Sequence, residues 1–93
     1  MQKNIEWFKE QFLPKLEGYE IKYRSFKDGD FGNLERAELE GNNKGITLDF
    51  WSTGWLGVHL VDYIKEEELL NAFLEPYQQE EKDKVLKRLQ ELL

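Results

Sequence analysis

The chain has 93 residues, and we expect residues 1–93 to form a single domain around one core. It contains no cysteine, which excludes a disulfide framework, thiolate catalysis and a cysteine-based zinc site. The polar start of the chain does not resemble a secretory leader, and no stretch approaches the roughly 20 apolar residues of a membrane span. We therefore expect a cytoplasmic protein with no membrane partner.

The first predicted element is a helix over residues 3–13. Ile5, Phe8 and Phe12 recur there at helical spacing, and Asn4 precedes them as the expected N-cap. Pro14 is expected to kink or end the helix, because proline lacks the backbone N–H that a helix interior needs.

Four strands are expected next, over residues 19–27, 34–40, 46–52 and 55–63. The first alternates apolar and charged residues, and turn-forming clusters follow both of the first two strands. The strand over 34–40 is so polar that we expect it near an edge of the sheet.

Two helices are expected at the end of the chain. The stretch "KEEELLNAFLEP" indicates a short amphipathic helix over 65–76, and residues 78–93 carry a leucine-rich stripe. The predicted fold class is therefore α+β: a four-stranded antiparallel meander with an N-terminal helix and two C-terminal helices, in the order α-β-β-β-β-α-α.

The hairpin in "ITLDFWSTGWLGVHLVDY" fixes which side chains share a face. A two-residue loop would scatter the aliphatic residues over both faces, whereas a three-residue loop of Ser52, Thr53 and Gly54 pairs Trp51 with Trp55. The second register gathers six apolar side chains on one face, and a slip of one residue would move them all into water. These six are Ile46, Leu48, Phe50, Leu56, Val58 and Leu60.

The opposite face then carries an unusual set of side chains. Asp49 and Trp51 come from one strand, and Trp55, His59 and Tyr63 come from the next. Three accounts compete for this face: the chain's own helices cover it, or it binds a protein, or it forms a catalytic or small-ligand pocket. Tryptophan and tyrosine are enriched at the centres of protein interfaces, which favours the second account.

The net charge of −6 is concentrated in one segment. Residues 62–83 hold eight acidic residues against two lysines, so this segment accounts for the whole excess. Such a field repels nucleic acid and accelerates the encounter with a basic protein, although an acidic solvated surface would give the same pattern.

The sequence offers little that indicates catalysis. His59 is the only histidine, which excludes sites that need two, and Ser52 lies in a turn far along the strand from His59 and Asp49. We expect a protein that is not an enzyme, with no catalytic residue, cofactor or metal.

The stretch "GITLDFWSTGWLGVHLVDYIKEEELLNAFLEP", followed by a leucine-rich terminal helix, resembles the immunity proteins of bacterial polymorphic toxin and contact-dependent growth-inhibition systems. The resemblance lies in architecture and composition: a small, acidic, cysteine-free α+β domain with an aromatic sheet. It implies a cytoplasmic protein that binds a toxin domain delivered by a neighbouring cell, often a basic nuclease, and neutralises it by covering its active site or an adjacent surface.

If the resemblance holds, the anchors and the charges of the interface can be named. We expect Trp51, Trp55 and Tyr63 to supply apolar area. The acidic residues would supply charge complementarity, and His59 completes the expected partner-binding set. The acidic residues in the partner-binding set are Asp49, Asp62, Glu66 and Glu67.

The alternative is a homodimeric structural or interaction protein that uses the same aromatic face to self-associate.

Overall fold

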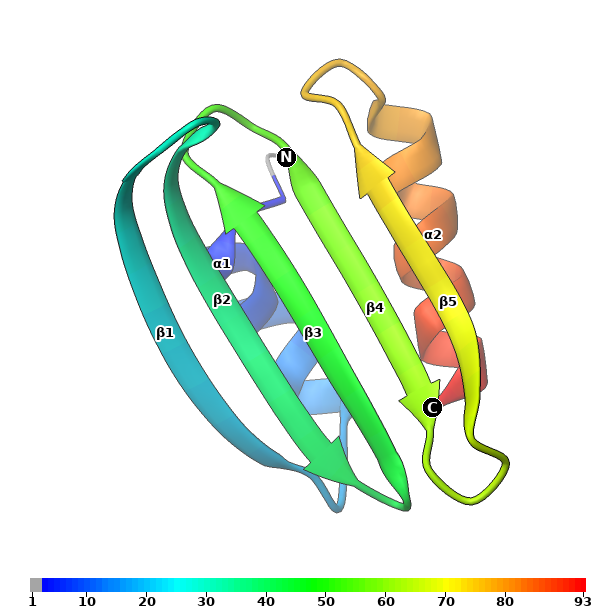
Figure 1. The fold of residues 1–93 in the computed structure, drawn as a ribbon. Coiled ribbons are helices and arrows are strands. Elements are labelled where there is room, and N and C mark those ends of the chain that lie inside the picture. The colour runs from blue at the N-terminus through cyan, green and yellow to red at the C-terminus, as the bar shows by residue number, and fades with distance from the viewer. Residues whose placement is uncertain (1–2) are drawn as a thin grey trace.

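The computed structural model describes residues 3–93, so Met1 and Gln2 of the predicted domain lie outside the described residues. It is an α+β fold with one antiparallel sheet of five strands, in the order β1-β2-β3-β4-β5 (Figure 1). The strands are β1 (Glu20–Gly29), β2 (Gly32–Gly41), β3 (Lys44–Trp51), β4 (Leu56–Asp62) and β5 (Glu67–Leu74).

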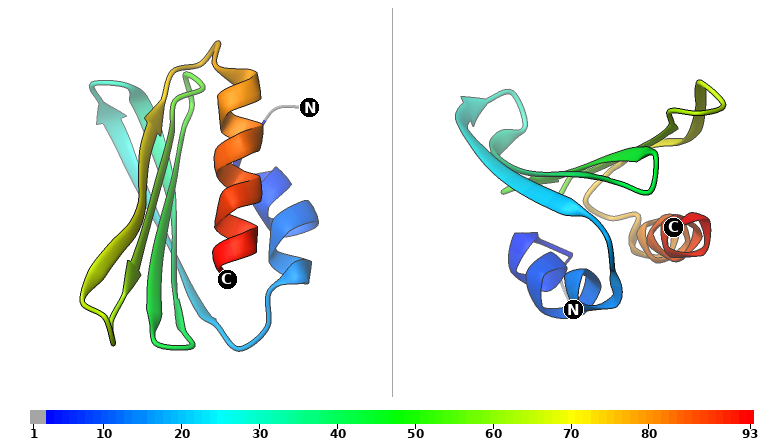
Figure 2. Two further views of the ribbon diagram at one scale, coloured as in Figure 1. Left: turned by 90° about the vertical axis from the view of Figure 1, so that its right-hand side faces the viewer. Right: turned by 90° about the horizontal axis from the view of Figure 1, so that it is seen from below.

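All helical segments pack against the same face of this sheet (Figure 2). The N-terminal segment comprises α1 (Ile5–Trp7), a π-helical turn η1 (Phe8–Phe12) and a 3₁₀ turn η2 (Leu13–Lys15). The C-terminal helix is α2 (Gln79–Leu92). The sheet therefore has one face covered by helices and one face that no described helix covers.

The N-terminal segment begins where the sequence predicts. The side chain of Asn4 accepts a hydrogen bond of 2.9 Å from the backbone N–H of Trp7, which confirms the N-cap. Phe8 and Phe12 are both buried, and their rings stack with centroids 5.6 Å apart. Phe8 also reaches Phe50 on β3, so this segment is fixed to the middle of the sheet.

The register of the β3–β4 hairpin is confirmed. Phe50 pairs with Leu56, Leu48 with Val58 and Ile46 with Leu60, and each of these side chains is at most 3% exposed. The backbone N–H of Trp51 donates to the carbonyl of Trp55, and Gly54 has a φ of +100°. This three-residue turn places the six aliphatic and aromatic side chains against the helices.

The prediction of four strands and two C-terminal helices is wrong. Residues 67–74 form the fifth strand, β5, which pairs antiparallel with β4. Leu70, Ala72 and Leu74 lie opposite Leu60, Val58 and Leu56 on the core face. Only one helix follows the sheet.

The error has a physical cause. A run such as "LLNAFL" satisfies the spacing of a helix and the alternation of a strand equally well, so periodicity alone does not decide. Without β5, the apolar strand β4 would be an unpaired edge, which proteins avoid. The backbone hydrogen bonds to β4 therefore decide in favour of a strand. Residues 34–40 are expected near an edge of the sheet, and β2 lies next to the edge strand β1, paired on both sides by β1 and β3.

Helix α2 closes the core over β4 and β5. Leu86 and Leu89 are buried in the same cluster as Leu48 and Leu60. Lys82, on the first turns of α2, is only 3% exposed; its Nζ donates to the carbonyl of Gly54 at 2.7 Å and to that of Pro76 at 3.1 Å. Burial lowers the pKa of this ammonium group.

Among residues 3–93, no helix has the length and apolar character that crossing a membrane would require.

Candidate functional site

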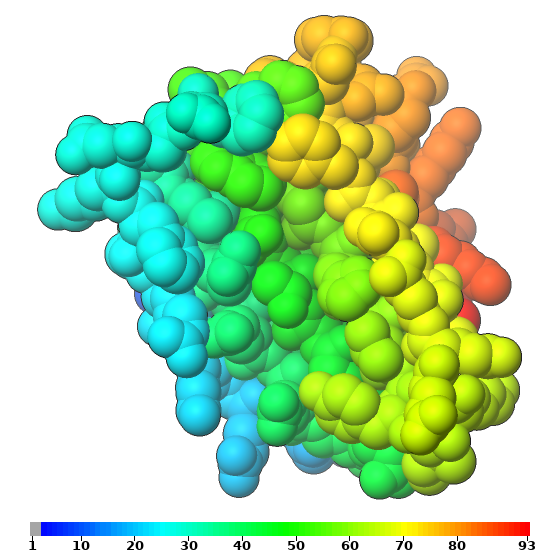
Figure 3. Space-filling model, in the orientation of Figure 1, coloured from blue at the N-terminus to red at the C-terminus, as the bar shows by residue number. Residues whose placement is uncertain are grey.

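The candidate site is the sheet face that the helices leave uncovered, called the open face below. Figure 3 views the molecule from this side, with both helical segments behind the sheet. The account in which the chain's own helices bury the two indoles is therefore wrong. Trp51 and Trp55 are nevertheless partly buried, because neighbouring side chains cover part of each indole.

Four rings form an aromatic cluster at one end of the open face: Phe31, Trp51, Trp55 and Phe73. Phe31 comes from the turn between β1 and β2, and Phe73 comes from β5. The Trp55 ring stacks on Phe73 with centroids 4.8 Å apart, and Phe31 lies 4.7 Å from Trp55. Phe31 is 38% exposed and Phe73 is 49% exposed, so the outer surface of the cluster faces solvent.

Gly57 makes room for one of the indoles. It lies opposite Asp49, as the predicted three-residue turn of the β3–β4 hairpin requires. A Cβ at residue 57 would lie 3.4 Å from Cζ3 of Trp51, so the indole lies across the glycine backbone. The space that a side chain at residue 57 would occupy is thus taken by the indole of Trp51.

Hydrogen bonds between two turns hold Phe31 over the indoles. The Oγ of Ser52 accepts from the backbone N–H of Asn33 at 2.9 Å, and the backbone N–H of Ser52 donates to the carbonyl of Asn33 at 2.8 Å. The Oγ1 of Thr53 donates to the carbonyl of Phe31. The β1–β2 turn is therefore fixed to the β3–β4 turn, and the ring of Phe31 is pre-positioned.

Ion pairs occupy the middle of the open face. Arg36 Nε donates to Asp49 Oδ1 at 2.7 Å and its Nη2 donates to Oδ2 at 3.2 Å. This hydrogen-bonded carboxylate raises the pKa of the Arg36 guanidinium, which also lies over the ring of Phe26. Arg24 and Glu38 form a second pair. The charge of Asp49, which we expected to face a partner, is thus already compensated within the chain.

His59 makes a third polar contact on this face. Its Nε2 lies 3.0 Å from Oε2 of Glu68 on β5. This hydrogen bond is the main cause of a lowered pKa at Glu68, and a hydrogen bond from Asn71 contributes as well.

A shallow polar hollow of about 230 Å³ lies at the other end of the open face. The Tyr63 side chain lies over Gly45, so closely that a Cβ at residue 45 would collide with the tyrosine hydroxyl. That hydroxyl donates to Glu40 Oε1 at 3.5 Å, and Tyr63 is 52% exposed. The side chains that give the polar hollow its character are Glu38, Glu40, Thr47, His59 and Tyr63.

The acidic segment does not form one patch. Because β5 runs the length of the sheet, about 25 Å for eight residues, it separates the acidic residues into two groups. The first group lies at the β4–β5 turn, where Asp62 Oδ1 also accepts from the backbone N–H groups of Ile64 and Lys65. The second group lies at the β5–α2 turn and the start of α2. The first group is Asp62, Glu66, Glu67 and Glu68, and the second is Glu75, Glu80, Glu81 and Asp83.

The structure brings part of the expected partner-binding set together. Trp51 and Trp55 are adjacent, and Asp49, His59 and Tyr63 share the open face with them. Trp55 precedes β4 and Tyr63 follows it, eight residues away, so the three expected anchors do not form one patch. Asp62, Glu66 and Glu67 lie at the Tyr63 end, in and beside the β4–β5 turn.

Sequence reasoning missed four residues of this face. Phe73 falls in a segment that the sequence predicts as a helix, and Arg36 falls in a polar strand that we expect near an edge of the sheet. Phe26 belongs to a predicted strand, but its face depends on the β1–β2 register. Phe31 is the one residue with a visible signal, because it is the only apolar side chain within the turn cluster "DGDFGN".

The described residues contain no arrangement that suggests catalysis. Ser52, His59 and Asp49 each bind a different partner, namely Asn33, Glu68 and Arg36, and so do not form a triad. No group of three or more His, Asp or Glu side chains that could hold a metal occurs among residues 3–93.

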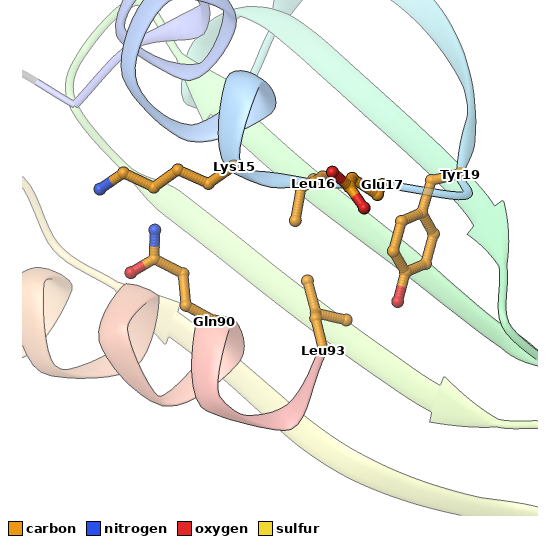
Figure 4. A pocket seen from close by; sticks show the side chains of 6 residues that line it. All are labelled: Lys15, Leu16, Glu17, Tyr19, Gln90 and Leu93. Atoms are coloured by element: carbon orange, nitrogen blue, oxygen red, sulfur yellow. The ribbon is translucent and has the colours of Figure 1, made fainter.

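A separate crevice of about 430 Å³ lies between the end of the N-terminal segment and the end of α2 (Figure 4). Tyr19 and Leu16 line it from one side, and Gln90 and Leu93 line it from α2. The Tyr19 hydroxyl is shielded from solvent and makes no hydrogen bond with a described residue. Lys15 and Glu17 complete its lining.

Comparisons of the chain with protein-family models, with curated proteins and with solved structures found no match.

Proposed function

We propose that this chain is a small binding protein that neutralises a toxin domain, as an immunity protein does, by covering part of the toxin with its open face. The observation that carries the proposal is the aromatic cluster on a sheet face that no described helix covers. Exposed aromatic side chains gathered on one face of a small protein are typical of a protein-binding site. The role requires binding and no catalysis.

The rigidity of the cluster supports this proposal. Each ring contacts at least two others of the cluster. Hydrogen bonds with Ser52 and Thr53 fix the turn that carries Phe31. A surface that is ordered before binding loses little conformational entropy when a partner docks.

The charge distribution supports a basic partner. The net charge is −6, and acidic groups flank the open face at both ends of β5. This field would accelerate the approach of a basic domain, such as many nucleases, and would disfavour direct binding to nucleic acid. The proposed compartment is the cytoplasm, where a delivered toxin would act.

A co-expression experiment tests this function. The gene that precedes this one is examined for a secreted protein, and the last domain of that protein is expressed with and without the present chain in a bacterial host. We expect growth arrest by the domain alone and growth with the pair. A Phe31→Ser variant should protect poorly, because it removes an exposed ring of the aromatic cluster. It should still fold, because this ring lies at the tip of a turn and contributes little to the core.

The matched control is Tyr77→Ser, which removes an aromatic side chain that is 78% exposed in the β5–α2 turn. Full protection by Phe31→Ser, or a stable homodimer in sedimentation that excludes the toxin domain, would contradict the proposal. The second result would favour the self-association alternative.

A further inference from the structure

The aromatic cluster is too small to be a whole interface. Its two exposed phenylalanines and the adjacent Phe26 are 38–49% exposed. With about 200 Å² for each side chain, the three expose a little under 300 Å². A stable protein–protein interface covers about 800 Å² on each partner. A partner must therefore contact more of the open face than the cluster.

The middle of the open face adds area but little charge recognition. Arg36 is already paired with Asp49, and Arg24 with Glu38. A partner could use these charges only by breaking an existing pair, which would leave its former partner uncompensated. The next place where a partner can gain a charged contact is the polar hollow.

The polar hollow has an excess of negative charge. Glu40 lies directly opposite Glu20 in the β1–β2 ladder, and carboxylates in such a position repel each other. Within residues 3–93, the one hydrogen bond of the Glu40 side chain is the long one from Tyr63. Lys22 and Arg24 line the adjoining groove with Glu40, but neither forms an ion pair with it. The ring of Tyr63 supplies an aromatic wall beside these carboxylates, a combination that suits a guanidinium group.

The distance between the two ends indicates the size of the occupant. Trp55 and Tyr63 flank the two ends of β4 and are eight residues apart, which corresponds to about 25 Å along an extended strand. A small molecule does not span this distance, but one protein surface does. A second copy of this chain fits poorly, because its own polar hollow carries the same negative charge.

We infer that the open face is a bipartite docking surface for one basic protein partner, which places an apolar side chain on the aromatic cluster and a basic side chain, best an arginine, in the polar hollow. This inference rests on the proposed function for the identity of the partner, but the two contact chemistries belong to the chain itself and are tested without the toxin.

The test uses two small probes on the free, ¹⁵N-labelled protein. N-acetyl-L-arginine amide and N-acetyl-L-leucine amide are titrated separately, and backbone amide shifts are recorded by NMR. The arginine probe should shift the amides of Glu40, Thr47 and Tyr63 in a saturable manner. The leucine probe should shift those of Phe31 and Phe73 instead.

Variants make the assignment specific. Glu40→Gln should weaken binding of the arginine probe by about tenfold, since the lost interaction is ionic. It should leave binding of the leucine probe unchanged. Glu17→Gln, an exposed carboxylate outside the polar hollow, is the matched control and should change neither. N-acetyl-L-lysine amide should bind more weakly than the arginine probe, because an ammonium group lacks the planar set of N–H donors of a guanidinium group.

Arginine-induced shifts that are scattered over the surface, or that persist unchanged in Glu40→Gln, would overturn the inference. So would a dimer held through the open face under the NMR conditions. These failures differ from failure of the proposed function, which would appear as absent protection in co-expression even if both probes bind as expected.

Discussion

The indole of Trp51 lies across the backbone of Gly57 on the neighbouring strand, with Cζ3 and Cη2 at 3.4 and 3.5 Å from the position of a Cβ. The aromatic cluster thus depends on a residue without a side chain. Substitution by valine would force the indole away from β4 and toward solvent.

We therefore expect Gly57→Val to destabilise the fold by about 1–3 kcal/mol, the usual cost of overfilling a packed site. The tryptophan emission should shift to longer wavelength, because the indole gains water contact. Urea unfolding followed by fluorescence measures both effects. An unchanged emission maximum would show that Trp51 does not lie over Gly57.

Glu66 has a φ of +55°, in the left-handed region that non-glycine residues rarely adopt. Glu66→Gly should therefore stabilise the β4–β5 turn by about 1 kcal/mol, because glycine adopts this conformation without a steric cost. If Glu66 faces a basic partner, the same change should slow association. Chemical denaturation measures the first effect and stopped-flow binding the second, and a loss of stability would contradict the backbone argument.

Lys82→Met removes a donor that the partly buried carbonyl groups of Gly54 and Pro76 share. The Pro76 carbonyl keeps a hydrogen bond from Gln79 Nε2, whereas the Gly54 carbonyl loses its lysine donor. At neutral pH we expect a loss of about 1 kcal/mol, since the unsatisfied Gly54 carbonyl outweighs relief from burying a cation. Lys87→Met, on the exposed side of α2, is the control and should change stability by less than about 0.5 kcal/mol.

The same variant gives a prediction about pH. Because the pKa of Lys82 is lowered in the folded state, the unfolded chain binds more protons as the pH approaches 10.5. Wild-type stability should therefore rise relative to Lys82→Met as the pH increases from 7 towards that value. Urea unfolding at several pH values measures the difference in unfolding free energy between the wild type and Lys82→Met. A difference that shrinks as the pH rises would contradict the prediction.

Glu68 should titrate differently when its hydrogen-bond donors are removed. His59→Ala should raise the pKa of Glu68 back toward its ordinary value, and Asn71→Ala should raise it by less. A lowered carboxylate pKa contributes stability above the ordinary value of 4.5 that is lost as the pH falls through the folded-state pKa. Carbon-detected NMR titration of Glu68 measures the order of the two effects, and an unchanged titration in His59→Ala would exclude the contact.

The part of the fold that sequence alone could establish is the part where burial is one-sided. In the β3–β4 hairpin, apolar residues alternate with polar ones, so only one register gives a core, and the structure has that register. Residues 67–74 lack this property because their apolar side chains satisfy either period. Their strand conformation depends on the free edge of β4, which is a tertiary effect.

The candidate face shows the same division. The two indoles could be placed on one face from their spacing and the turn length. The contacts of Phe31 and Phe73 with Trp55 could not be predicted, because each joins segments more than 15 residues apart in the sequence. The pairing of Arg36 with Asp49 likewise follows from the β2–β3 register. In the polar sequence of β2, only Ala37 and Leu39 mark the core face, which is too short an alternation to fix that register.

The most direct test of the central claim, that the open face binds a toxin domain, is a dissociation constant. The ligand is the last domain of the secreted protein that the proposal expects the preceding gene to encode. The dissociation constant is measured by calorimetry for the wild-type chain, Phe73→Glu, Phe73→Ala and Tyr77→Glu, after circular dichroism has shown that each variant is folded. We predict that Phe73→Glu weakens binding by about 2 kcal/mol or more, that Phe73→Ala weakens it by less, and that Tyr77→Glu leaves it unchanged. Folded Phe73 variants that bind as tightly as the wild type would contradict the claim.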